Sequence, residues 1–336
     1  MPARPSDSKE LLIGIDAGGT GTRAVLVAPG GTVLGYGSAG PANVNTVGLD
    51  AALAQVLEAT RAAWASAGLP ASPAASAFIG AAGLRASGSR ERLIERFQAA
   101  GAVRPRHCDA SGDTESAHAG ALAGSPGITL MVGTGSYCLG SDSSGRRAEC
   151  GGWGWLLDDV GGGAFLGLEA LKAAVRALDG RSEPTSLSAR ITRHTNLPDV
   201  RSLPALIQRA DSLPTLLASL APLVLDEARA GDSVAGSVLA RGAAGLAELA
   251  VTVSRSLAWQ QPPVVAITGG LGRSGEPYQP LVEAAVLQRL PSSLTLPPRL
   301  PPVGGAALLA ARLLGWPVDQ TFVERLRASL PARKSP

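Results

Sequence analysis

The segment IGIDAGGTGTRAVL, residues 13–26, decides the fold that we expect for this chain. Two apolar runs, LLIGI before a glycine-rich turn and AVLVA after it, are typical of the two strands of a β-hairpin. GGTVLGYG at 30–37 continues the pattern as a third strand. The chain therefore begins with an antiparallel β-meander that has a glycine turn between its first two strands.

The turn itself has the composition of a phosphate-binding site. Three residues, Gly18, Gly19 and Gly21, leave backbone N–H groups open to phosphate oxygens because they carry no Cβ, and two hydroxyl donors, Thr20 and Thr22, lie beside them. Asp16 at the strand end would repel phosphate unless Mg²⁺ or its water lies between them, which predicts a magnesium-linked role. An ordinary tight hairpin explains this segment about equally well when it is taken alone.

A second glycine-turn hairpin occurs about 115 residues later, in ITLMVGTGSYCLGS at 128–141. It repeats the strand, the glycine turn and the hydroxyls in Gly133, Thr134, Gly135 and Ser136. Two such turns can hold a polyphosphate, so we predict a nucleotide triphosphate site. No Lys follows either turn and neither opens a helix, which disfavours the P-loop and dinucleotide-binding readings.

A third buried strand broken by glycines, AITGGLGRSG, covers residues 266–275. Alone it is explained by a strand-to-helix turn. After two phosphate turns, Gly269 and Gly270 more plausibly let an adenine or ribose lie close to the backbone, with Arg273 stacking or pairing nearby.

Candidate general bases lie in DASGDTESAHAGAL at 109–122, which offers Asp109, Asp113 and Glu115 ahead of a small-residue helix. A hydroxyl that attacks a γ-phosphate benefits from a carboxylate that orients it and accepts its proton. An Asp at a helix start is also a common cap, and the residues alone do not rank the three acids.

Aromatic residues and carboxylates gather in CGGWGWLLDDVGGGAFLG at 150–167. Aromatic faces beside carboxylates suit a sugar, which has an apolar face and a rim of hydroxyls. A buried Trp pair that packs a glycine loop is nearly as good an explanation. Asn43 and Asn45 in GPANVNTVG are either turn residues or hydroxyl ligands.

Composition and length indicate a globular chain of two domains with a site in the cleft between them. The chain has 336 residues, of which 45% are hydrophobic and 17% charged, with a net charge of +3. The arginines are scattered, so nucleic-acid binding gains little support. Three cysteines without C-x-x-C spacing indicate neither disulfides nor a thiolate metal site. We expect a cytoplasmic protein with no signal peptide or membrane span.

Helical periodicity accounts for most of the remaining chain. We expect helices at 50–67, 89–100, 163–178, several within 203–258, and at 304–315 and 319–330.

In the order and spacing of these motifs, the chain resembles the N-acetylglucosamine kinases of the BadF/BadG/BcrA/BcrD group, within the actin, hsp70 and sugar-kinase superfamily. The resemblance spans almost the whole chain. It is carried by IDAGGTGTRA, GPANVNTVG, the interval from Asp113 to Gly133, GGWGWLLDD, ITGGLG and PVGGAALLAA. It implies an α/β fold of two ribonuclease-H-like (actin-like ATPase) domains that close around ATP, Mg²⁺ and an amino sugar, with a homodimer as a further expectation.

The resemblance also implies roles for individual residues. Asp113 falls on the catalytic aspartate that also contacts the sugar, Asp16 and Thr20 on the first phosphate loop, and Thr134 on the second. The sugar positions are Asn43, Gly152, Trp153 and Asp159, to which we add Ser136. Ala218, Gly269 and Gly270 fall near the nucleotide. We expect domains at 1–117, completed by a helix at 318–333, and at 118–317.

The sequence departs from the family pattern on the sugar side. Relatives read G-D-E-G-S where this chain has Asp158, Asp159, Val160, Gly161 and Gly162, and an Asn usually stands in place of Gly112. The exact acceptor sugar is therefore open among glucosamine, N-acetylglucosamine and related hexoses.

Two other functions fit parts of the pattern. An ATPase that activates a reductase or dehydratase, the other branch of the group, would need cluster thiolates, and Cys138 and Cys150 do not form such a pattern. A sugar-sensing regulator would carry an added DNA-binding domain, and about ten residues precede the first strand.

Overall fold

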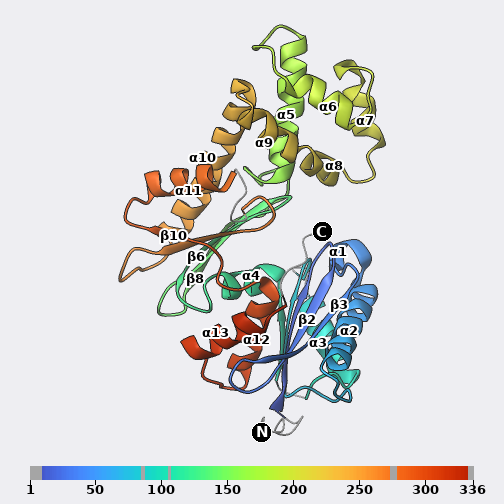
Figure 1. Cartoon of the computed structure of the whole chain (residues 1–336), viewed down its shortest axis with the longest axis vertical. Helices are drawn as coiled ribbons and strands as arrows, with labels where there is room; N and C mark the ends of the chain where they lie inside the picture. The colour runs from blue at the N-terminus through green and yellow to red at the C-terminus, as the bar shows by residue number, and fades with distance from the viewer. Residues whose placement is uncertain (1–9, 85–87, 105–106, 273–277, 332–336) are drawn as a thin grey trace. The chain divides into compact units, whose positions relative to one another are not determined.

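The computed structural model describes residues 10–84, 88–104, 107–272 and 278–331, in two compact units. The first unit consists of Met1–Ser125 and Pro298–Pro336, and the second of Pro126–Pro297. Figure 1 labels the α-helices and some of the strands of both units.

The first unit contains a five-stranded sheet in the order β3-β2-β1-β4-β5. Its strands are β1 (Leu12–Ala17), β2 (Thr22–Val27), β3 (Val33–Ala39), β4 (Ser76–Ala81) and β5 (Cys108–Ser111). The first three form an antiparallel meander, whereas β4 and β5 run parallel to β1. The predicted hairpin and third strand are thus confirmed.

Helices cover both faces of this sheet, as expected for strands as apolar as β1. One core joins Ile13 and Ile15 to α2 (Leu49–Ser66) and α3 (Ser89–Ala99). The other joins Leu12 and Val25 to helices of the C-terminal segment. The remaining helices of the unit are α1 (Val44–Val47), α4 (Asp113–Ala121), α12 (Pro302–Leu313) and α13 (Gln320–Ser329).

The position of α12 changes the expected division of the chain. A Cβ on Gly14 of β1 would lie 2.4 Å from the backbone nitrogen of Ala307, and one on Gly305 would lie 1.9 Å from the carbonyl oxygen of Ser116. These glycines let α12 pack directly on β1 and α4. The helix therefore belongs to the first unit, whereas we expected 304–315 in the C-terminal domain, and the break after Ser125 falls past the expected boundary at 117.

The second unit repeats the same topology. Its sheet has the order β10-β9-β6-β7-β8, with β6 (Gly127–Val132), β7 (Ser136–Ser141), β8 (Arg147–Gly151), β9 (Val264–Thr268) and β10 (Leu294–Leu296). Antiparallel β6, β7 and β8 correspond to β1, β2 and β3, and parallel β9 and β10 correspond to β4 and β5. The two glycine turns therefore occupy equivalent places in two similar sheets.

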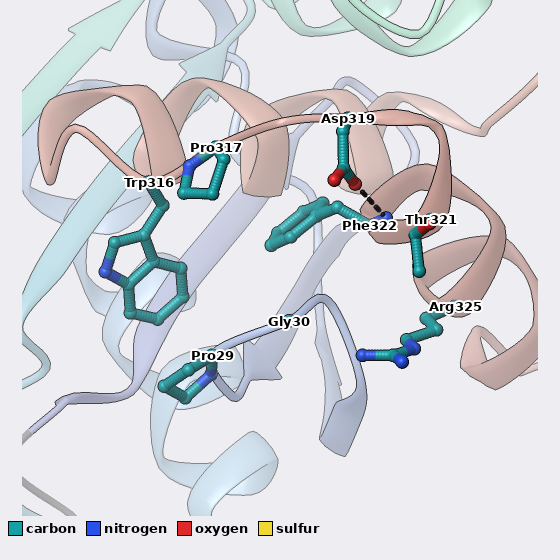
Figure 2. A pocket seen from close by; sticks show the side chains of 8 residues that line it. All are labelled: Pro29, Gly30, Trp316, Pro317, Asp319, Thr321, Phe322 and Arg325. Atoms are coloured by element: carbon teal, nitrogen blue, oxygen red, sulfur yellow. Dashed lines mark hydrogen bonds between the residues drawn. The ribbon is translucent and has the colours of Figure 1, made fainter.

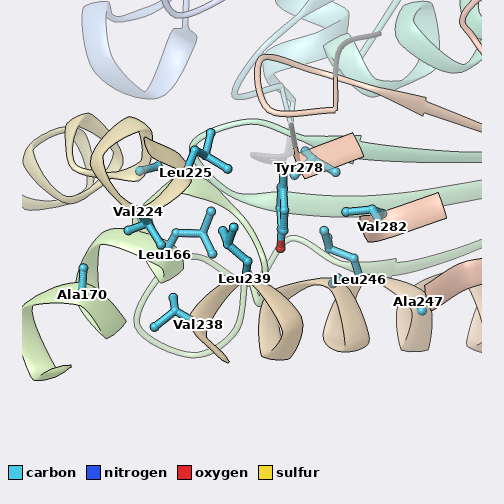
Figure 3. Close-up of a cluster of buried hydrophobic side chains, with 14 of the residues drawn as sticks. Leu166, Ala170, Val224, Leu225, Val238, Leu239, Leu246, Ala247, Tyr278 and Val282 are labelled. Carbon is cyan, nitrogen blue, oxygen red and sulfur yellow. The ribbon is translucent and has the colours of Figure 1, made fainter. Parts of the chain in front are cut away.

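The second unit is otherwise helical. Its helices are α5 (Gly163–Leu178), α6 (Leu187–His194), η2 (Val200–Ser202), α7 (Leu203–Arg209), α8 (Leu213–Ser219), α9 (Ala221–Arg229), α10 (Ser233–Arg255) and α11 (Tyr278–Arg289). Figure 3 shows how Leu166 of α5, Leu239 and Leu246 of α10, and Val282 of α11 meet around the buried ring of Tyr278.

α10 is long and apolar enough to cross a membrane, with a mean hydropathy of 1.4. Half of the 18-residue stretch of α10 that gives this value is buried inside the unit. Val238, Leu246 and Val253 of the helix belong to the hydrophobic core. Packing in the core accounts for its apolar side chains.

Candidate active site

The first glycine turn joins β1 to β2 and is held from several sides. The Gly18 N–H donates to the Gly21 carbonyl over 3.1 Å, and the Gly18 carbonyl accepts from the Ala42 N–H over 2.9 Å. Gly19 and Thr20 are exposed, and a Cβ on Gly19 would meet nothing within 4 Å. The outer side of the turn is therefore open, which a ligand approaching Gly19 and Thr20 requires.

Thr22 has a different local role from the one expected. Its side chain is buried, and its hydroxyl donates to the Gly40 carbonyl over 2.8 Å. With its proton committed to Gly40, the hydroxyl ties β2 to the chain after β3. Among the two threonines of the turn, Thr20 is the one whose exposure leaves it accessible to phosphate.

Asp16 projects to the side of the first sheet on which Asp113 lies. Asp16 is in register with Gly80 of β4, and a Cβ on Gly80 would lie 2.1 Å from Ser116 Oγ and 3.6 Å from Asp113 Cα. Residues in register on neighbouring strands point to the same face, so the Asp16 side chain projects towards the face that α4 covers. Gly80 is needed because any side chain there would displace Ser116.

The position of Asp113 separates it from Asp109. Asp113 is the first residue of α4, one turn before Ser116. Asp109 instead forms an ion pair with Arg90 at 2.5 Å and accepts from the Ala110 N–H. This salt bridge occupies the Asp109 carboxylate and raises the pKa of Arg90, chiefly through the hydrogen bond between the two side chains. Of the two aspartates, Asp113 therefore has the better position beside Asp16.

Asn43 lies at the N-terminus of α1. Its Oδ1 accepts from the Asn45 N–H over 3.0 Å, and a Cβ on Gly83 would lie 2.6 Å from the same oxygen. Because Oδ1 already accepts this capping hydrogen bond, the amide nitrogen of Asn43 is the side-chain atom left for a sugar. The sugar contact of Asn43 stays a prediction.

The second glycine turn is fixed to the start of α5. The carbonyl of Gly133 accepts from the Gly163 N–H over 2.8 Å, and that of Thr134 accepts from the Ala164 N–H over 2.9 Å. Two N–H groups in the first turn of α5 are thereby satisfied by the hairpin, and Thr134 stays exposed. The helix acts as a rigid support for the turn.

Close packing explains one departure from the family pattern. A Cβ on Gly162 would lie 2.6 Å from the carbonyl carbon of Gly135, too near for any side chain. The position that carries Ser in relatives is thus filled here by the turn itself. Val160, which replaces the acidic residue, packs on α10, where a Cβ on Gly245 would lie 2.2 Å from Val160 Cγ1.

Asp159 is a buried carboxylate on this loop. It has φ 58°, a left-handed conformation, and its Oδ1 has no hydrogen-bond partner among the described residues. Burial raises the pKa of Asp159, and the charge of Asp158 adds to the rise, against hydrogen bonds from the Ser136 and Gly154 N–H groups. The Ser136 hydroxyl, which we assigned to the sugar, donates to the Val160 carbonyl over 3.0 Å.

The two tryptophans of the loop differ in environment. Trp153 is 72% exposed, with Leu156 and Leu157 exposed beside it, whereas Trp155 packs against the core of the second unit. The alternative of a buried Trp pair therefore fails for Trp153. Gly152 has φ 75°, and a Cβ there would lie 2.7 Å from Tyr137 Cδ2.

The residues expected near the nucleotide base lie on the second unit. Gly269 has φ 100°, and a Cβ there would lie 2.3 Å from the Val132 carbonyl, so the turn after β9 wraps the end of β6. Gly270 is exposed and open. Ala218 of α8 approaches Gly163, where a Cβ would lie 3.2 Å from Ala218 Cβ. Arg273 lies outside the described residues.

Two pockets among the described residues contain none of the candidate site residues. One, of about 360 Å³, lies in the first unit between the β2–β3 turn at Pro29 and the Trp316 to Arg325 segment (Figure 2). The other, of about 650 Å³, lies between α5 and α10. Among the described residues, His, Cys, Asp and Glu form no group of three or more that could hold a metal ion.

Sequence reasoning missed Gly80 and Arg23. Arg23 is the register partner of Asp16 across the hairpin, and its Nη1 lies 3.7 Å from Asp16 Oδ2. Residues that lie opposite each other in a hairpin can be paired by counting outward from its turn, and this count would have placed Arg23 opposite Asp16.

Comparison with known proteins gives one family and several kinases to which this chain is similar. A model of the BadF/BadG/BcrA/BcrD ATPase family matches residues 13–310. The N-acetylmuramic acid/N-acetylglucosamine kinase of Clostridium acetobutylicum is 29% identical over 78% of this chain and 85% of its own length. The glucosamine kinase of Vibrio cholerae is 30% identical over 70% of this chain and 77% of its own.

A solved structure resembles most of the chain. The crystal structure of a proposed N-acetylglucosamine kinase from Chromobacterium violaceum has a TM-score of 0.73 at 32% identity, covering 90% of this chain and all of that one. The expected fold of two actin-like α/β domains is confirmed. The chain belongs to the BadF/BadG/BcrA/BcrD ATPase family.

Proposed function

We propose that this protein is an ATP-dependent kinase that phosphorylates an amino sugar, N-acetylglucosamine or glucosamine, at the 6-hydroxyl. The observation that carries the proposal is the proximity of Asp16 and Asp113. Asp16 projects to the face of the first sheet that α4 covers, the Asp113 Cα lies on that face next to Gly80, and Asp16 borders an open glycine turn. A phosphate-binding turn next to a candidate base is what phosphoryl transfer to a hydroxyl requires.

In this reaction Asp113 orients the sugar hydroxyl and accepts its proton as the oxygen attacks the γ-phosphorus. The bond from that phosphorus to the β-phosphate oxygen breaks, and ADP leaves. Gly19 and Thr20 offer N–H and hydroxyl donors to the phosphates, and Thr134 does so on the second turn. The Gly18 N–H, which donates to the Gly21 carbonyl, keeps the turn closed instead. Mg²⁺ held by Asp16 would neutralise the charge that develops on the phosphates.

Asp159 and Trp153 are the proposed sugar ligands on the second unit. A buried carboxylate oxygen without a partner among the described residues can accept a hydrogen bond from a sugar hydroxyl or amide. The exposed Trp153 ring offers an apolar surface to the pyranose. The relatives' names support an amino sugar as the acceptor. A cytoplasmic location and a homodimer stay predictions.

The alternative of a cluster-bearing activator is disfavoured by the cysteines. Cys138 and Cys150 face each other across β7 and β8, and Cys138 is fully buried. A thiolate that bridges to a second chain has to be exposed, and burial raises the pKa of Cys138 well above its ordinary value. These thiols are packed as core residues.

The test is a panel of glucosamine, N-acetylglucosamine, N-acetylmannosamine, N-acetylmuramic acid and glucose, each incubated with Mg-ATP. ADP release gives the rate, and ³¹P–¹H correlation spectra of the product identify the phosphorylated oxygen. We expect one of the first two sugars to give the highest kcat/KM and a 6-phosphate product. ADP release that does not depend on any sugar would contradict the proposal and favour an ATPase.

A further inference from the structure

Arg23 occupies a position that the proposed reaction leaves without a role. It follows the first glycine turn on β2, in register with Asp16 on β1. Register partners in an antiparallel pair point to the same face, so Arg23 and Asp16 project together at the turn. The distance of 3.7 Å between Arg23 Nη1 and Asp16 Oδ2 is that of an ion pair.

Exposure differs between the two partners. The Asp16 side chain is 12% exposed and that of Arg23 36%, so the carboxylate lies inside and the guanidinium reaches outward. A guanidinium has five N–H donors in a planar fork, and one carboxylate contact leaves others available. Arg23 can therefore hold Asp16 and still present N–H groups beside the turn.

Charge makes this position unusual within the proposed nucleotide site. The two glycine-turn hairpins, residues 12–27 and 127–141, contain no other Lys or Arg. Their glycines and threonines offer only neutral donors, and Asp16 adds a negative charge. A polyanion that approaches the first turn meets Arg23 as the one cation that the hairpins supply.

We propose that Arg23 binds a phosphate oxygen of the nucleotide, and that it pairs with Asp16 when the site is empty. If Asp16 holds Mg²⁺, its carboxylate would no longer need the Arg23 guanidinium, whose N–H groups would then be available to the phosphate. The inference rests on the proposed function, because it requires the first turn to bind a nucleotide. It assigns Arg23 the charge that a P-loop lysine supplies in other folds, from the opposite strand of a hairpin.

A purely structural role is the competing explanation. In that case Arg23 only neutralises and orients Asp16, and it makes no contact with the ligand. The two explanations differ in one measurable respect: a structural Arg23 has no effect on nucleotide affinity once the Asp16 charge is removed.

The experiment is a double-mutant cycle on nucleotide affinity, measured by calorimetry without sugar. The proteins are the wild type, Arg23→Gln, Asp16→Asn and the double variant, each titrated with Mg-ADP, Mg-ATP and adenosine. We expect Arg23→Gln to weaken ADP and ATP binding roughly 10- to 100-fold in both the wild-type and the Asp16→Asn background, since hydrogen bonds between charged groups have this strength. Adenosine affinity should not change.

Two further variants control the cycle. Arg190→Gln removes an arginine of equal exposure, also ion-paired, from α6 of the second unit, and its nucleotide affinity should match the wild type. Arg23→Lys should recover part of the affinity, since it retains the charge but not the fork.

An Arg23→Gln change without effect in the Asp16→Asn background overturns the inference, as does an equal loss of adenosine affinity. Failure of the proposed function has a different signature, because the wild type itself would then not bind Mg-ATP. Far-UV circular dichroism of all variants shows whether each is folded.

Discussion

Replacing Gly162 with Ala tests how closely the second glycine turn packs on α5. The Gly162 backbone has φ −71° and ψ 168°, which any residue adopts, so the substitution introduces no backbone strain. The added Cβ would instead lie 2.6, 2.8 and 2.9 Å from the carbonyl carbon, Cα and carbonyl oxygen of Gly135. All three are backbone atoms, so no side-chain rotation can relieve the overlap.

The turn must therefore move away from α5. Forced overpacking of this kind costs about 1–3 kcal/mol in the free energy of unfolding. Displacement of the turn also stretches the two hydrogen bonds from Gly163 and Ala164 to its carbonyls. We expect Gly162→Ala to lower the free energy of unfolding by that amount, measured by urea denaturation, and to weaken Mg-ATP binding.

Gly236→Ala is the matched control. Gly236 lies in α10 of the same unit, and a Cβ there meets nothing within 4 Å. Alanine in a helix is more stable than glycine by roughly 0.5–1 kcal/mol, so this variant should gain stability and bind ATP like the wild type. If Gly162→Ala were as stable as Gly236→Ala and bound ATP equally well, the close packing of turn and helix would be refuted.

Two further predictions follow from the carboxylates of the second unit. Because burial raises the pKa of Asp159, the native state binds a proton more tightly than the unfolded chain there, and stability falls as pH rises above 3.8. Asp159→Asn should therefore have a free energy of unfolding about 1 kcal/mol higher than that of the wild type at pH 7, and this advantage should vanish below pH 3.8. Its sugar affinity should be reduced. A stability advantage that does not depend on pH would contradict this. The pKa of Asp232 is lowered to about 2 because hydrogen bonds from Ala235, Ser186 and Thr185 outweigh the opposing effect of burial. Its stabilising effect is complete above pH 3.8 and is lost as pH falls towards 2, so Asp232→Ala should lose about 1 kcal/mol at pH 7 and progressively less in acid; a constant difference across a pH series of thermal melts would refute the assignment.

The sequence was informative wherever local pattern decides structure. The two glycine turns are enclosed by short apolar runs whose period identifies strands, and their repetition revealed the duplicated topology. Asp16 was expected at the end of the first strand and Asp113 at the start of a helix, and both placements needed no knowledge of distant contacts. The same holds for α3, which ends near Gly101, and for α5, which begins after Gly162.

Contacts between segments far apart in the sequence could not be predicted from the sequence. Assignment of α12 to the first unit depends on Gly14, which makes room for Ala307 of α12 across almost 300 residues of chain, and on Gly305, which makes room for Ser116 of α4. The hydroxyls of Thr22 and Ser136 bond to carbonyls that only the folded chain brings near. A hydroxyl beside a glycine turn has the same sequence signature whether it faces a ligand or a neighbouring carbonyl.

The position of Gly162 illustrates a different limit. The departure from the family pattern at this position left the acceptor sugar open, and the structure shows that the backbone of Gly135 occupies the space that a side chain at 162 would need. Sequence comparison registers the absent Ser but not the atoms that fill its place.

The central claim is that Asp113 is the base that accepts the proton of a sugar hydroxyl. It is tested most directly by comparing Asp113→Asn with the wild type under saturating Mg-ATP and the best sugar of the panel, with Asp109→Asn as the control. Loss of a general base should lower kcat roughly 10²- to 10⁴-fold while Mg-ATP affinity is retained, and Asp109→Asn, whose carboxylate is paired with Arg90, should keep most of the activity. Undiminished kcat in Asp113→Asn would contradict the account.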